Sequence, residues 1–361
     1  MAKPRRGELD GERLKEYAKQ VFGALGGAMT SAMIHLGDRM GLYRILADTE
    51  SLSSDELAER AGLSERWVRE WLHQQGAAGI LEHLGEGRFA LSPEGAAVLA
   101  DEDHPAFGAG FFGSLPGNMA VVDRLPEAFR SGVGLPYDVF GPEGARGIER
   151  GFAPWFRRFL VPVALPRIEG VVGALETGAT VADVGCGSGT ALVEMARAFP
   201  KSGFHGYEVS LHALERAEAK RDEAGLSNLA FHDVRREPLP GDGRFAFVTT
   251  FDCLHDMTDP AGVIREIRRA IRDDGTWLIC DIKAHDGFEQ NVERNPMASM
   301  MYGMSILTCM SSALSDAGGA GLGTLGFSES VAREMVGEAG FRHFEVLDLG
   351  HPVNAFYVVR P

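Results

Sequence analysis

The hydrophobic pattern in the second half of the chain alternates between two periods. Short apolar runs are typical of buried strands, and the stretches between them carry apolar residues at helical spacing. This alternation predicts an α/β fold with a doubly wound, Rossmann-like parallel sheet. The predicted strands are residues 180–185, 203–209, 229–233, 245–252 and 276–282.

The end of the chain departs from this alternation. Residues 343–350 and 354–361 are again strand-like, but only residues 351–353 join them. That link is too short for a helical crossover, so the two runs must pair antiparallel. We therefore expect a parallel sheet with an antiparallel last strand.

Apolar residues at helical spacing also run through residues 12–47, which predicts one long helix or two. Small residues stand among them, at Gly26, Gly27, Ala28 and Ser31. A face of small side chains lets helices approach closely. Two interpretations are open, because such a face can dock against a second subunit or pack within its own chain.

Residues 51–100 resemble a winged helix-turn-helix. Ser53 or Ser54 is expected to cap a short helix that ends at Gly62, and Ser64 is expected to cap the second helix. Two short strands should follow as the wing.

The charge of this segment argues against DNA binding. Residues 51–100 carry four arginines against eight acidic residues, whereas a DNA-reading helix needs a positive surface. We therefore expect a structural or dimerisation role. The predicted assembly is a homodimer formed by residues 12–47 together with this segment.

The chain is expected to have three parts. Residues 1–100 form a mainly helical winged-helix domain, and residues 101–165, rich in Gly, Pro and Phe, form a helical connector. Residues 166–361 form the α/β domain, in which an insertion at residues 285–326 interrupts the alternation.

Composition excludes several classes of function. The 361 residues include 36 basic and 51 acidic ones, for a net charge of −15, so the protein's field repels nucleic acid and anionic membranes. No apolar stretch approaches the ~18 residues that span a bilayer, and the charged opening predicts no secretory leader. The four cysteines have no paired spacing, which argues against disulfides and zinc. We expect a cytoplasmic protein with no nucleic-acid or membrane partner.

The segment after the first predicted strand carries the strongest chemical signal. Residues 181–190 read VADVGCGSGT, with glycines at Gly185, Gly187 and Gly189. Glycines let the backbone turn sharply and approach a ligand, and the amides at the next helix start point toward it. The G-x-G-x-G spacing after Asp183 differs from the dinucleotide turn G-x-G-x-x-G. The pattern resembles motif I of class I methyltransferases that use S-adenosylmethionine.

Two acidic residues at later strand ends agree with this resemblance. Glu208 ends the second predicted strand, where its carboxylate can accept two hydrogen bonds from a ribose diol. Asp233 ends the third, where it can receive an adenine amino group. The resemblance thus implies that S-adenosylmethionine is bound by Asp183, Gly185, Gly187, Gly189, Glu208, Asp233, Val234 and Phe251.

Taken together, the chain resembles class I methyltransferases that carry an N-terminal winged-helix domain. Its resemblance to bacterial, especially actinobacterial, members covers nearly the whole chain and includes Tyr302, Ser305, Cys309 and residues 354–357. Its similarity to plant-type small-molecule O-methyltransferases is local. It rests on residues 254–259, LHDMTD, which look like the segment that holds the catalytic base in that family.

This local similarity implies that His255 is a general base and that Asp281 orients its ring. His255 lies just past the fourth predicted strand, where open α/β sheets bind ligands. An imidazole there can take the proton of an attacking alcohol or phenol, and Asp281 near the end of the fifth strand would fix its tautomer. The alternative is that both side chains cap local turns.

A metal-assisted reaction is a competing hypothesis. Asp252, Asp256 and Asp281 could gather a divalent cation, but the Asp-Asn pair of catechol methyltransferases is Asp-Ile here. An iron site on His255 would need a second histidine; residues 286–342 contain none, which leaves His285 and His351 as candidates. We predict no metal.

The insertion is rich in methionine, which fills irregular apolar space and adapts to varied ligands. We expect it to form a wall or lid of the acceptor pocket, with Tyr302 and Ser305 contacting the substrate. Packing as a core helix against the N-terminal domain is the alternative.

Three functions are compatible with these features. The first is an enzyme that methylates a small molecule, favoured at a hydroxyl group, with N-, C- and metal-dependent methylation as variants. The second is a regulator that binds S-adenosylmethionine and uses the winged helix on DNA, and the third is a donor-binding protein without turnover. We favour the first because the donor motif and His255 occur together. The sequence does not identify the acceptor, because specificity depends on pocket shape.

Overall fold

The fold is described from a computed structural model of the chain, covering residues 9–361. Its internal contacts define two compact units, one ending at Leu115 and the other spanning Pro116–Pro361. Each unit is described by itself. Residues 1–8, where the sequence predicts no leader, lie outside the described residues.

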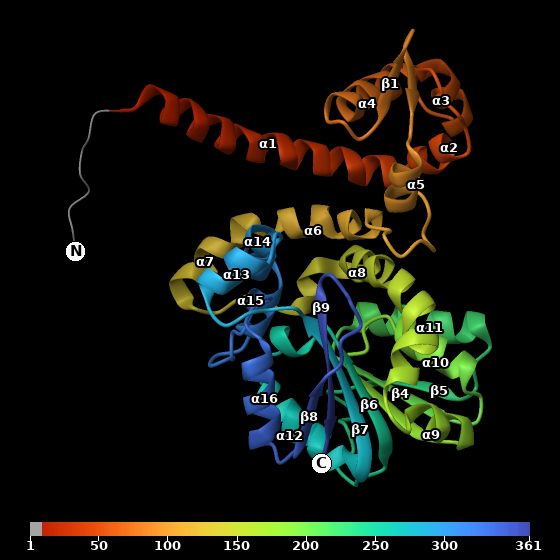
Figure 1. The fold of residues 1–361 in the computed structure, drawn as a ribbon, viewed down its shortest axis with the longest axis vertical. Coiled ribbons are helices and arrows are strands. Elements are labelled where there is room, and N and C mark those ends of the chain that lie inside the picture. Colours follow the sequence, from red (N-terminus) through yellow and green to blue (C-terminus); the bar gives the residue numbers. More distant parts are fainter. Residues whose placement is uncertain (1–8) are drawn as a thin grey trace. The chain divides into compact units, whose positions relative to one another are not determined.

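The first unit opens with two helices, as the periodicity of residues 12–47 predicts. Helix α1 (Gly11–Arg39) begins at Asp10, whose carboxylate accepts hydrogen bonds from two N–H groups of the first turn, and α2 (Leu42–Ala47) follows. Figure 1 shows α1 running well past the other helices of this unit. The Trp71 indole donates to the Met33 carbonyl at 2.9 Å, which fixes the C-terminal part of α1 to the winged helix.

The winged-helix pattern is confirmed in its elements. Ser53 and Glu56 form a reciprocal capping box. Ser64 is the N-cap residue of the second helix, as predicted, but its side chain forms no capping hydrogen bond. A capping hydroxyl at Ser64 would accept a hydrogen bond from the Trp67 N–H. Here the Trp67 N–H donates to the Ser64 carbonyl instead. The elements are α3 (Ser54–Ala61), α4 (Glu65–Ala77), β1 (Glu82–Gly85), β2 (Arg88–Ala90), α5 (Pro93–Leu99) and η1 (Ala109–Ser114).

The second unit is built on a seven-stranded sheet in the order β5-β4-β3-β6-β7-β9-β8. Strands β3 to β7 are parallel, whereas β9 pairs antiparallel with both β7 and β8, as the short link predicts. The strand order reverses between β3 and β6, which is where doubly wound sheets bind ligands. The strands are β3 (Thr180–Val184), β4 (Gly203–Glu208), β5 (Leu229–Asp233), β6 (Phe245–Phe251), β7 (Ile271–Ile282), β8 (His343–Val346) and β9 (Asn354–Arg360).

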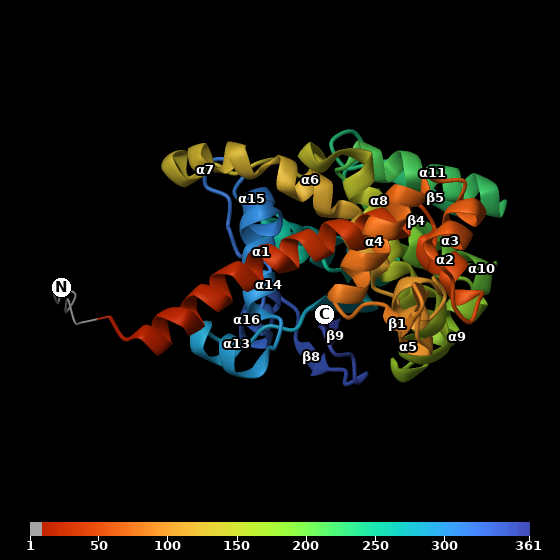
Figure 2. The same cartoon turned by 90° about the horizontal axis from the view of Figure 1, so that it is seen from above.

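Helices cover both faces of this sheet. Figures 1 and 2 both show α10 (Thr190–Ala198) and α11 (Leu211–Ala224) on the opposite side of the sheet from α16 (Glu329–Glu338). One apolar cluster joins α10 and α9 (Val171–Thr177) to one face, and a second joins α12 (Pro260–Ala270) and α16 to the other. The sheet therefore has a buried core on each side, which holds its strand ends in fixed positions.

The segment before the sheet and the insertion after β7 are both helical. The predicted domain boundaries and the predicted limits of the insertion stay predictions. Before β3 come α6 (Leu115–Ala120), η2 (Val122–Arg124), α7 (Leu125–Ser131), η3 (Tyr137–Phe140), α8 (Gly141–Trp155), η4 (Phe156–Ala164) and η5 (Leu165–Arg167); after β7 come α13 (Phe288–Arg294), α14 (Ala298–Leu307) and α15 (Cys309–Ala313).

No helix in the described part of the chain is both long enough and apolar enough to cross a membrane.

Candidate active site

The candidate site lies at the carboxyl ends of the central strands, around the loop that follows β3. The three glycines of this loop, Gly185, Gly187 and Gly189, have φ values of 72°, 52° and 70°, a conformation that only glycine adopts cheaply. A Cβ on Gly189 would lie 2.5 Å from Cζ of Phe231, whereas one on Gly187 would meet nothing within 4 Å. The loop thus packs tightly at Gly189 and leaves open space at Gly187, as a ligand cradle requires.

Glu208, at the end of β4, points its carboxylate at this loop. Its Oε2 accepts a hydrogen bond from the Gly187 N–H at 2.8 Å, and its Oε1 accepts from the N–H groups of Val209 and Ser210, each at 2.8 Å. Burial raises the pKa of Glu208, against the lowering effect of these three bonds. The predicted ribose-binding carboxylate is therefore beside the glycine loop.

Asp183 lies beneath the loop. Its side chain is buried, and its Oδ1 accepts a hydrogen bond from the Thr249 hydroxyl of β6 at 2.8 Å. Burial raises the pKa of Asp183 to about 8. This geometry gives Asp183 a role in joining β3 to β6. Its predicted contact with the donor stays a prediction.

Asp233, at the end of β5, is paired with a neighbour. Its Oδ1 accepts from Nε of Arg235 at 2.8 Å and its Oδ2 from Nη2 at 3.1 Å, and this hydrogen bonding lowers the pKa of Asp233. An adenine amino group would have to share or replace this arginine. Val234 donates its N–H to the Glu208 carbonyl at 3.1 Å, so these two predicted donor-site residues are brought together.

Phe251, the last residue of β6, belongs to an aromatic cluster. Its ring centroid lies 5.0 Å from that of Phe156 and 6.3 Å from that of Trp155. Both partners come from the helical segment before the sheet. Phe251 therefore fixes this segment to the strand end beside the site.

The predicted catalytic pair is brought together. His255 lies in the short turn η6 (Leu254–Asp256), and its Nδ1 is 2.6 Å from Oδ1 of Asp281 on β7. Both side chains are buried, with 3% and 1% of their surface exposed. The same Oδ1 accepts the Ile282 N–H at 2.7 Å, which fixes the carboxylate. With the carboxylate at Nδ1, the assigned tautomer has its proton there and its lone pair at Nε2.

Electrostatics favours a proton on this imidazole. Burial by itself would lower the pKa of His255, but the neighbouring Asp281 carboxylate and Cys309 together raise the pKa well above its ordinary value. The second Asp281 oxygen, Oδ2, is buried without a hydrogen-bond partner. Asp281 is therefore placed to stabilise an imidazolium.

Two further aspartates line this end of the site. Asp252 has a left-handed backbone, with φ of 49°, and its carboxylate accepts a hydrogen bond from the Asn354 side chain. A non-glycine residue in this conformation is uncommon and often marks a functional site. Burial, followed by the Asp281 charge, raises the pKa of Asp252 well above its usual value, and burial does the same for Asp256.

Sequence reasoning missed the contribution of residues 137–138. The Asp138 carboxylate accepts from the Ser210 hydroxyl at 2.5 Å, and so holds η3 against the end of β4. Burial, followed by the charges of Asp256 and Glu208, raises the pKa of Tyr137 well above its usual value. Tyr137 is thus near both ends of the site. Nothing in the local pattern distinguished it from the other aromatic residues of residues 101–165.

The two predicted substrate contacts already have partners within the chain. The Ser305 hydroxyl accepts the Thr324 N–H at 3.1 Å. Tyr302 packs on an apolar cluster, with its ring centroid 5.9 Å from that of Phe288. Their role toward a substrate stays a prediction.

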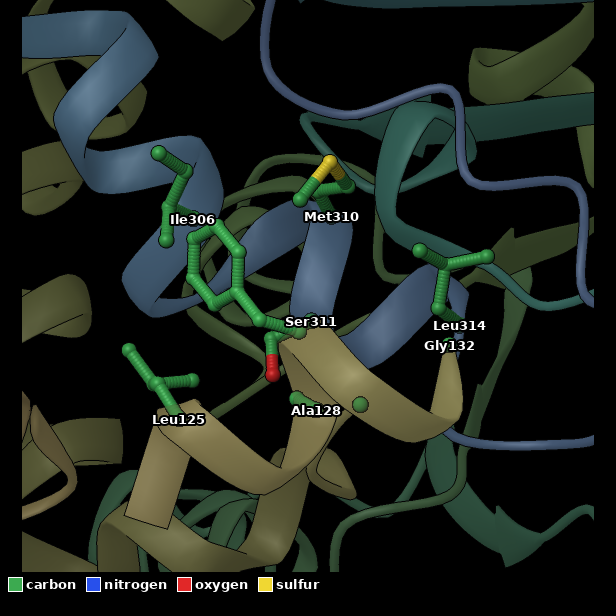
Figure 3. Close-up of a pocket in the computed structure, with 9 residues that line it drawn as sticks. Leu125, Ala128, Gly132, Ile306, Met310, Ser311 and Leu314 are labelled. Carbon is green, nitrogen blue, oxygen red and sulfur yellow. The ribbon is translucent and has the colours of Figure 1, made fainter. Parts of the chain in front are cut away.

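An apolar cavity of about 80 Å³ lies beside α7 and α15. Figure 3 shows Ile306 and Met310 on one side of it and Leu125 and Ala128 of α7 on the other. The segment after α7 is tied to α15, because the Leu135 N–H donates to the Ser311 hydroxyl at 2.9 Å. The wall of this cavity is thus continuous with the helix that carries Cys309.

No group of three or more His, Cys, Asp or Glu side chains within residues 9–361 is arranged to hold a metal ion.

Two models of known protein families match separate parts of the chain. Residues 175–327 match the family model of a methyltransferase domain, and residues 28–101 match that of an Rv2258c-like winged HTH domain. The ubiquinone biosynthesis O-methyltransferase of Paracidovorax citrulli is 28% identical over 142 residues, which are 39% of this chain and 54% of that protein. The chain spans about half the length of this curated relative, and less of others.

Solved structures share the fold over almost the whole chain. An O-methyltransferase family protein from Burkholderia thailandensis aligns with a TM-score of 0.68 and 16% identity, covering 98% of both chains. Human N-acetylserotonin methyltransferase, in complex with SAM, aligns with a TM-score of 0.67 and 15% identity, covering 98% of this chain and 99% of that one. At such identities the likeness shows the fold alone. The two family matches show that the chain carries a methyltransferase domain over residues 175–327 and a winged HTH domain over residues 28–101.

Proposed function

We propose that this protein transfers a methyl group from S-adenosylmethionine to the hydroxyl oxygen of a small molecule, with His255 as the general base. The observation that carries the proposal is the 2.6 Å contact between Nδ1 of His255 and Oδ1 of Asp281. Once the imidazole is neutral, which its raised pKa makes more frequent at higher pH, this contact keeps the proton on Nδ1 and leaves Nε2 free to accept one. The pair lies at the end of the sheet that also bears the glycine loop.

The glycine loop and Glu208 fit the proposed donor. Gly187 leaves room above the loop, and the buried Glu208 carboxylate beside it suits ribose hydroxyl groups. When bound, S-adenosylmethionine supplies a methyl group on a positively charged sulfur. The aspartates at the other end, Asp252 and Asp256, would favour a cation once ionised. Asp233 and Val234 would hold the adenine, and Phe251 would close the site by packing.

In this proposal each residue of the pair has a separate task. Nε2 of His255 accepts the proton of the acceptor hydroxyl as its oxygen attacks the methyl group. Asp281 keeps Nδ1 protonated and stabilises the imidazolium that results. A neutral alcohol is a poor nucleophile, so removal of its proton is the contribution that a base makes to this displacement.

The acceptor is expected to have an apolar part. The cavity beside α15 is lined almost entirely by carbon atoms, including those of Ile306 and Met310. A methionine-lined wall adapts to varied ligand shapes, which supports the insertion as one wall of the acceptor pocket. Tyr302 and Ser305 would form the polar contacts with the acceptor, once the acceptor replaces the partners that these two side chains now have.

The winged helix is proposed to bind no nucleic acid. On α4, Arg69 is paired with Glu65 at 3.1 Å, and Arg66 with Glu70 at 2.5 Å. These carboxylates neutralise the helix that would enter a DNA groove. A gel shift at low salt that retained DNA at micromolar protein would contradict this.

The N-terminal helix is proposed to form a homodimer with a second copy of the chain. Along α1, large apolar side chains recur at helical spacing and are more than half exposed: Leu14 51%, Tyr17 68%, Val21 53%, Leu25 58% and Met29 54%. A contiguous apolar stripe of this kind is typical of an interface. In light scattering, we expect a dimer that the double substitution Val21→Glu, Leu25→Glu converts to a monomer, whereas the control Lys19→Glu does not. A monomeric natural chain would refute the assembly.

The enzymatic proposal is tested by product formation. The full chain is incubated with S-adenosylmethionine and a library of phenols, hydroxy acids and amines, and S-adenosylhomocysteine is measured. We expect turnover with a hydroxyl-bearing compound and an O-methyl group in the product by NMR. No turnover with any class, despite measurable donor binding, would favour a binding protein, and methylation at carbon or nitrogen alone would overturn the hydroxyl assignment.

A further inference from the structure

We propose that Lys220 is a positioning residue for donor binding, which fixes the glycine loop after β3 from its place on α11. The inference deepens the proposed function and rests on it for the identity of the donor. It is carried by hydrogen bonds and ion pairs that the methyl-transfer proposal does not use, and the comparisons assign no role to this residue.

The first observation is that the Lys220 ammonium group has three polar partners. Its Nζ donates to the Ser188 carbonyl at 3.1 Å and to the Thr190 hydroxyl at 2.6 Å, and it lies 2.7 Å from Oε1 of Glu149. An ammonium group has three donors and no acceptor, so these partners engage all of its hydrogen-bonding capacity. The side chain is 21% exposed, and it is therefore held in one place.

Two of these partners lie on either side of Gly189 in the loop. The Gly189 N–H donates to the Cys186 carbonyl at 2.9 Å, which closes the turn. A Cβ on Gly189 would lie 3.1 Å from Cβ of Ala217, so α11 packs against the loop one turn before Lys220. Lys220 thus sets the path of the loop directly after the open position at Gly187.

The second observation is the carboxylate that pairs with Lys220. Glu149 of α8 is 11% exposed, and its Oε2 accepts from Nε of Arg216 at 2.6 Å. Arg216 and Lys220 are four residues apart, so they lie on the same face of α11. Figures 1 and 2 show α8, α10 and α11 side by side. One carboxylate therefore pairs with two cations, and the bonds from this cluster to the loop come from Lys220.

The stability of the neighbouring helix does not explain the place of this cation. Thr190 is the first residue of α10, and the N-terminus of a helix carries a partial positive charge. A cation there is unfavourable, and moving an ammonium group out of water costs further free energy. Glu149 offsets both costs. An arrangement that breaks a local rule is expected where it serves a functional site.

A fixed loop should raise the affinity for the donor. The apparent affinity of a ligand falls with the fraction of molecules whose site is in the binding conformation. Without Lys220, the Ser188 carbonyl and the Thr190 hydroxyl lose this partner. The glycines around them allow many other backbone conformations, so the donor would have to order the loop as it binds.

The first test measures the loop without any ligand. Amide hydrogen exchange of the full chain is followed by mass spectrometry in a peptide that covers residues 185–190. In Lys220→Met, exchange there should be about tenfold faster, the effect expected for the loss of one hydrogen bond to a charged group. Arg216→Gln breaks a pair with the same Glu149 but leaves the bonds from Lys220 to the loop. It is the matched control and should leave this exchange rate unchanged.

The second test measures donor binding. In calorimetry with S-adenosylmethionine, we expect the dissociation constant to be at least about threefold higher in Lys220→Met than in the natural chain. Arg216→Gln should bind as the natural chain does. If the cluster only joined α8 to α11, both variants would lose stability in urea and donor affinity to a similar degree.

Thr190→Val is a milder variant for the case that Lys220→Met does not fold, which circular dichroism checks. It keeps nearly the same shape and removes one of the bonds between Lys220 and the loop. Exchange of the same peptide should be about threefold faster, as expected for the loss of one hydrogen bond.

The proposal is overturned if the loop peptide exchanges at the natural rate in Lys220→Met or, where that variant does not fold, in Thr190→Val. Equal effects in Arg216→Gln also overturn it, as does faster exchange with unchanged donor affinity. A natural chain that binds no S-adenosylmethionine would count against the proposed function. The exchange rates alone would then decide whether Lys220 fixes the loop.

Discussion

The two ends of the candidate site are built from different parts of the polypeptide. At the donor end the site is shaped by the backbone, because the loop of Gly185, Gly187 and Gly189 can adopt its conformation only without side chains. At the other end, buried titratable side chains meet, with His255 and Asp281 2.6 Å apart. The contrast teaches that substitutions at the first end should damage shape and binding, whereas substitutions at the second should damage chemistry.

The largest effect is expected at the chemical end. His255→Ala should lower turnover by about 10² to 10⁴, the usual contribution of a general base, while donor affinity measured by calorimetry stays nearly constant. Asp281→Asn should cost less, because the imidazole remains. Because the pKa of His255 is raised, the unprotonated base becomes more abundant as pH increases, and turnover of the natural chain should rise above pH 7. If His255→Ala kept at least half of the turnover while the chemical step was rate-limiting, His255 would not be the general base.

At the backbone end, the sharpest prediction concerns stability. Gly189→Ala places a Cβ 2.5 Å from Cζ of Phe231 and holds it at φ of 70°. The left-handed conformation costs about 1 to 2 kcal/mol for alanine, and overpacking costs about 1 to 3 kcal/mol. We expect the free energy of unfolding in urea to fall by about 2 to 5 kcal/mol. The control Gly173→Ala, in a helix with nothing within 4 Å, should be neutral or stabilising.

Much of the donor end could be predicted from the sequence because its signals are local. The strand, the glycine spacing and the carboxylates at successive strand ends occupy short segments, and the strands lie where the apolar runs predict. Strand β7 is an exception, since it begins at Ile271, before the predicted residues 276–282. Residues 272–274 are Arg-Asp-Asp and are exposed, so no apolar run predicted that they belong to the strand.

The chemical end could be predicted only in part, because its residues come from distant segments. The resemblance of residues 254–259 located His255 and pointed to Asp281. Tyr137 reaches the same place through the packing of η3, which no local pattern encodes. The Arg235 partner of Asp233 was also missed, because two adjacent opposite charges are usually a solvated surface pair.

A smaller effect should separate donor binding from chemistry. Glu208→Gln replaces a carboxylate that accepts three backbone N–H bonds with an amide whose NH₂ cannot accept. We expect affinity for S-adenosylmethionine, measured by calorimetry, to weaken by about 1 to 3 kcal/mol, as is typical for hydrogen bonds to a charged group. Glu215→Gln, on the exposed surface of α11, should leave affinity unchanged. Equal affinities in all three proteins would exclude Glu208 from the donor site.

The smallest effect concerns Asp183, which joins the strands beneath the loop. Its folded pKa is about 8, against about 3.9 in an unfolded chain. Between about pH 4 and pH 8, Asp183 is protonated in the folded chain and ionised in the unfolded chain. Its contribution to stability is therefore complete below about pH 4 and is lost as the pH rises toward 8.

Asparagine cannot ionise but can still accept the Thr249 hydroxyl. Between pH 6 and pH 7 the natural chain should therefore lose up to about 1.4 kcal/mol of unfolding free energy relative to Asp183→Asn. Urea unfolding at both pH values measures this difference, and Asp273→Asn, 96% exposed, is the control that should follow the natural chain. If Asp183→Asn has the same pH dependence as the natural chain, Asp183 is ionised in the fold. The donor loop would then rest on a buried charge, and the division between a backbone-built end and a charged end would no longer hold.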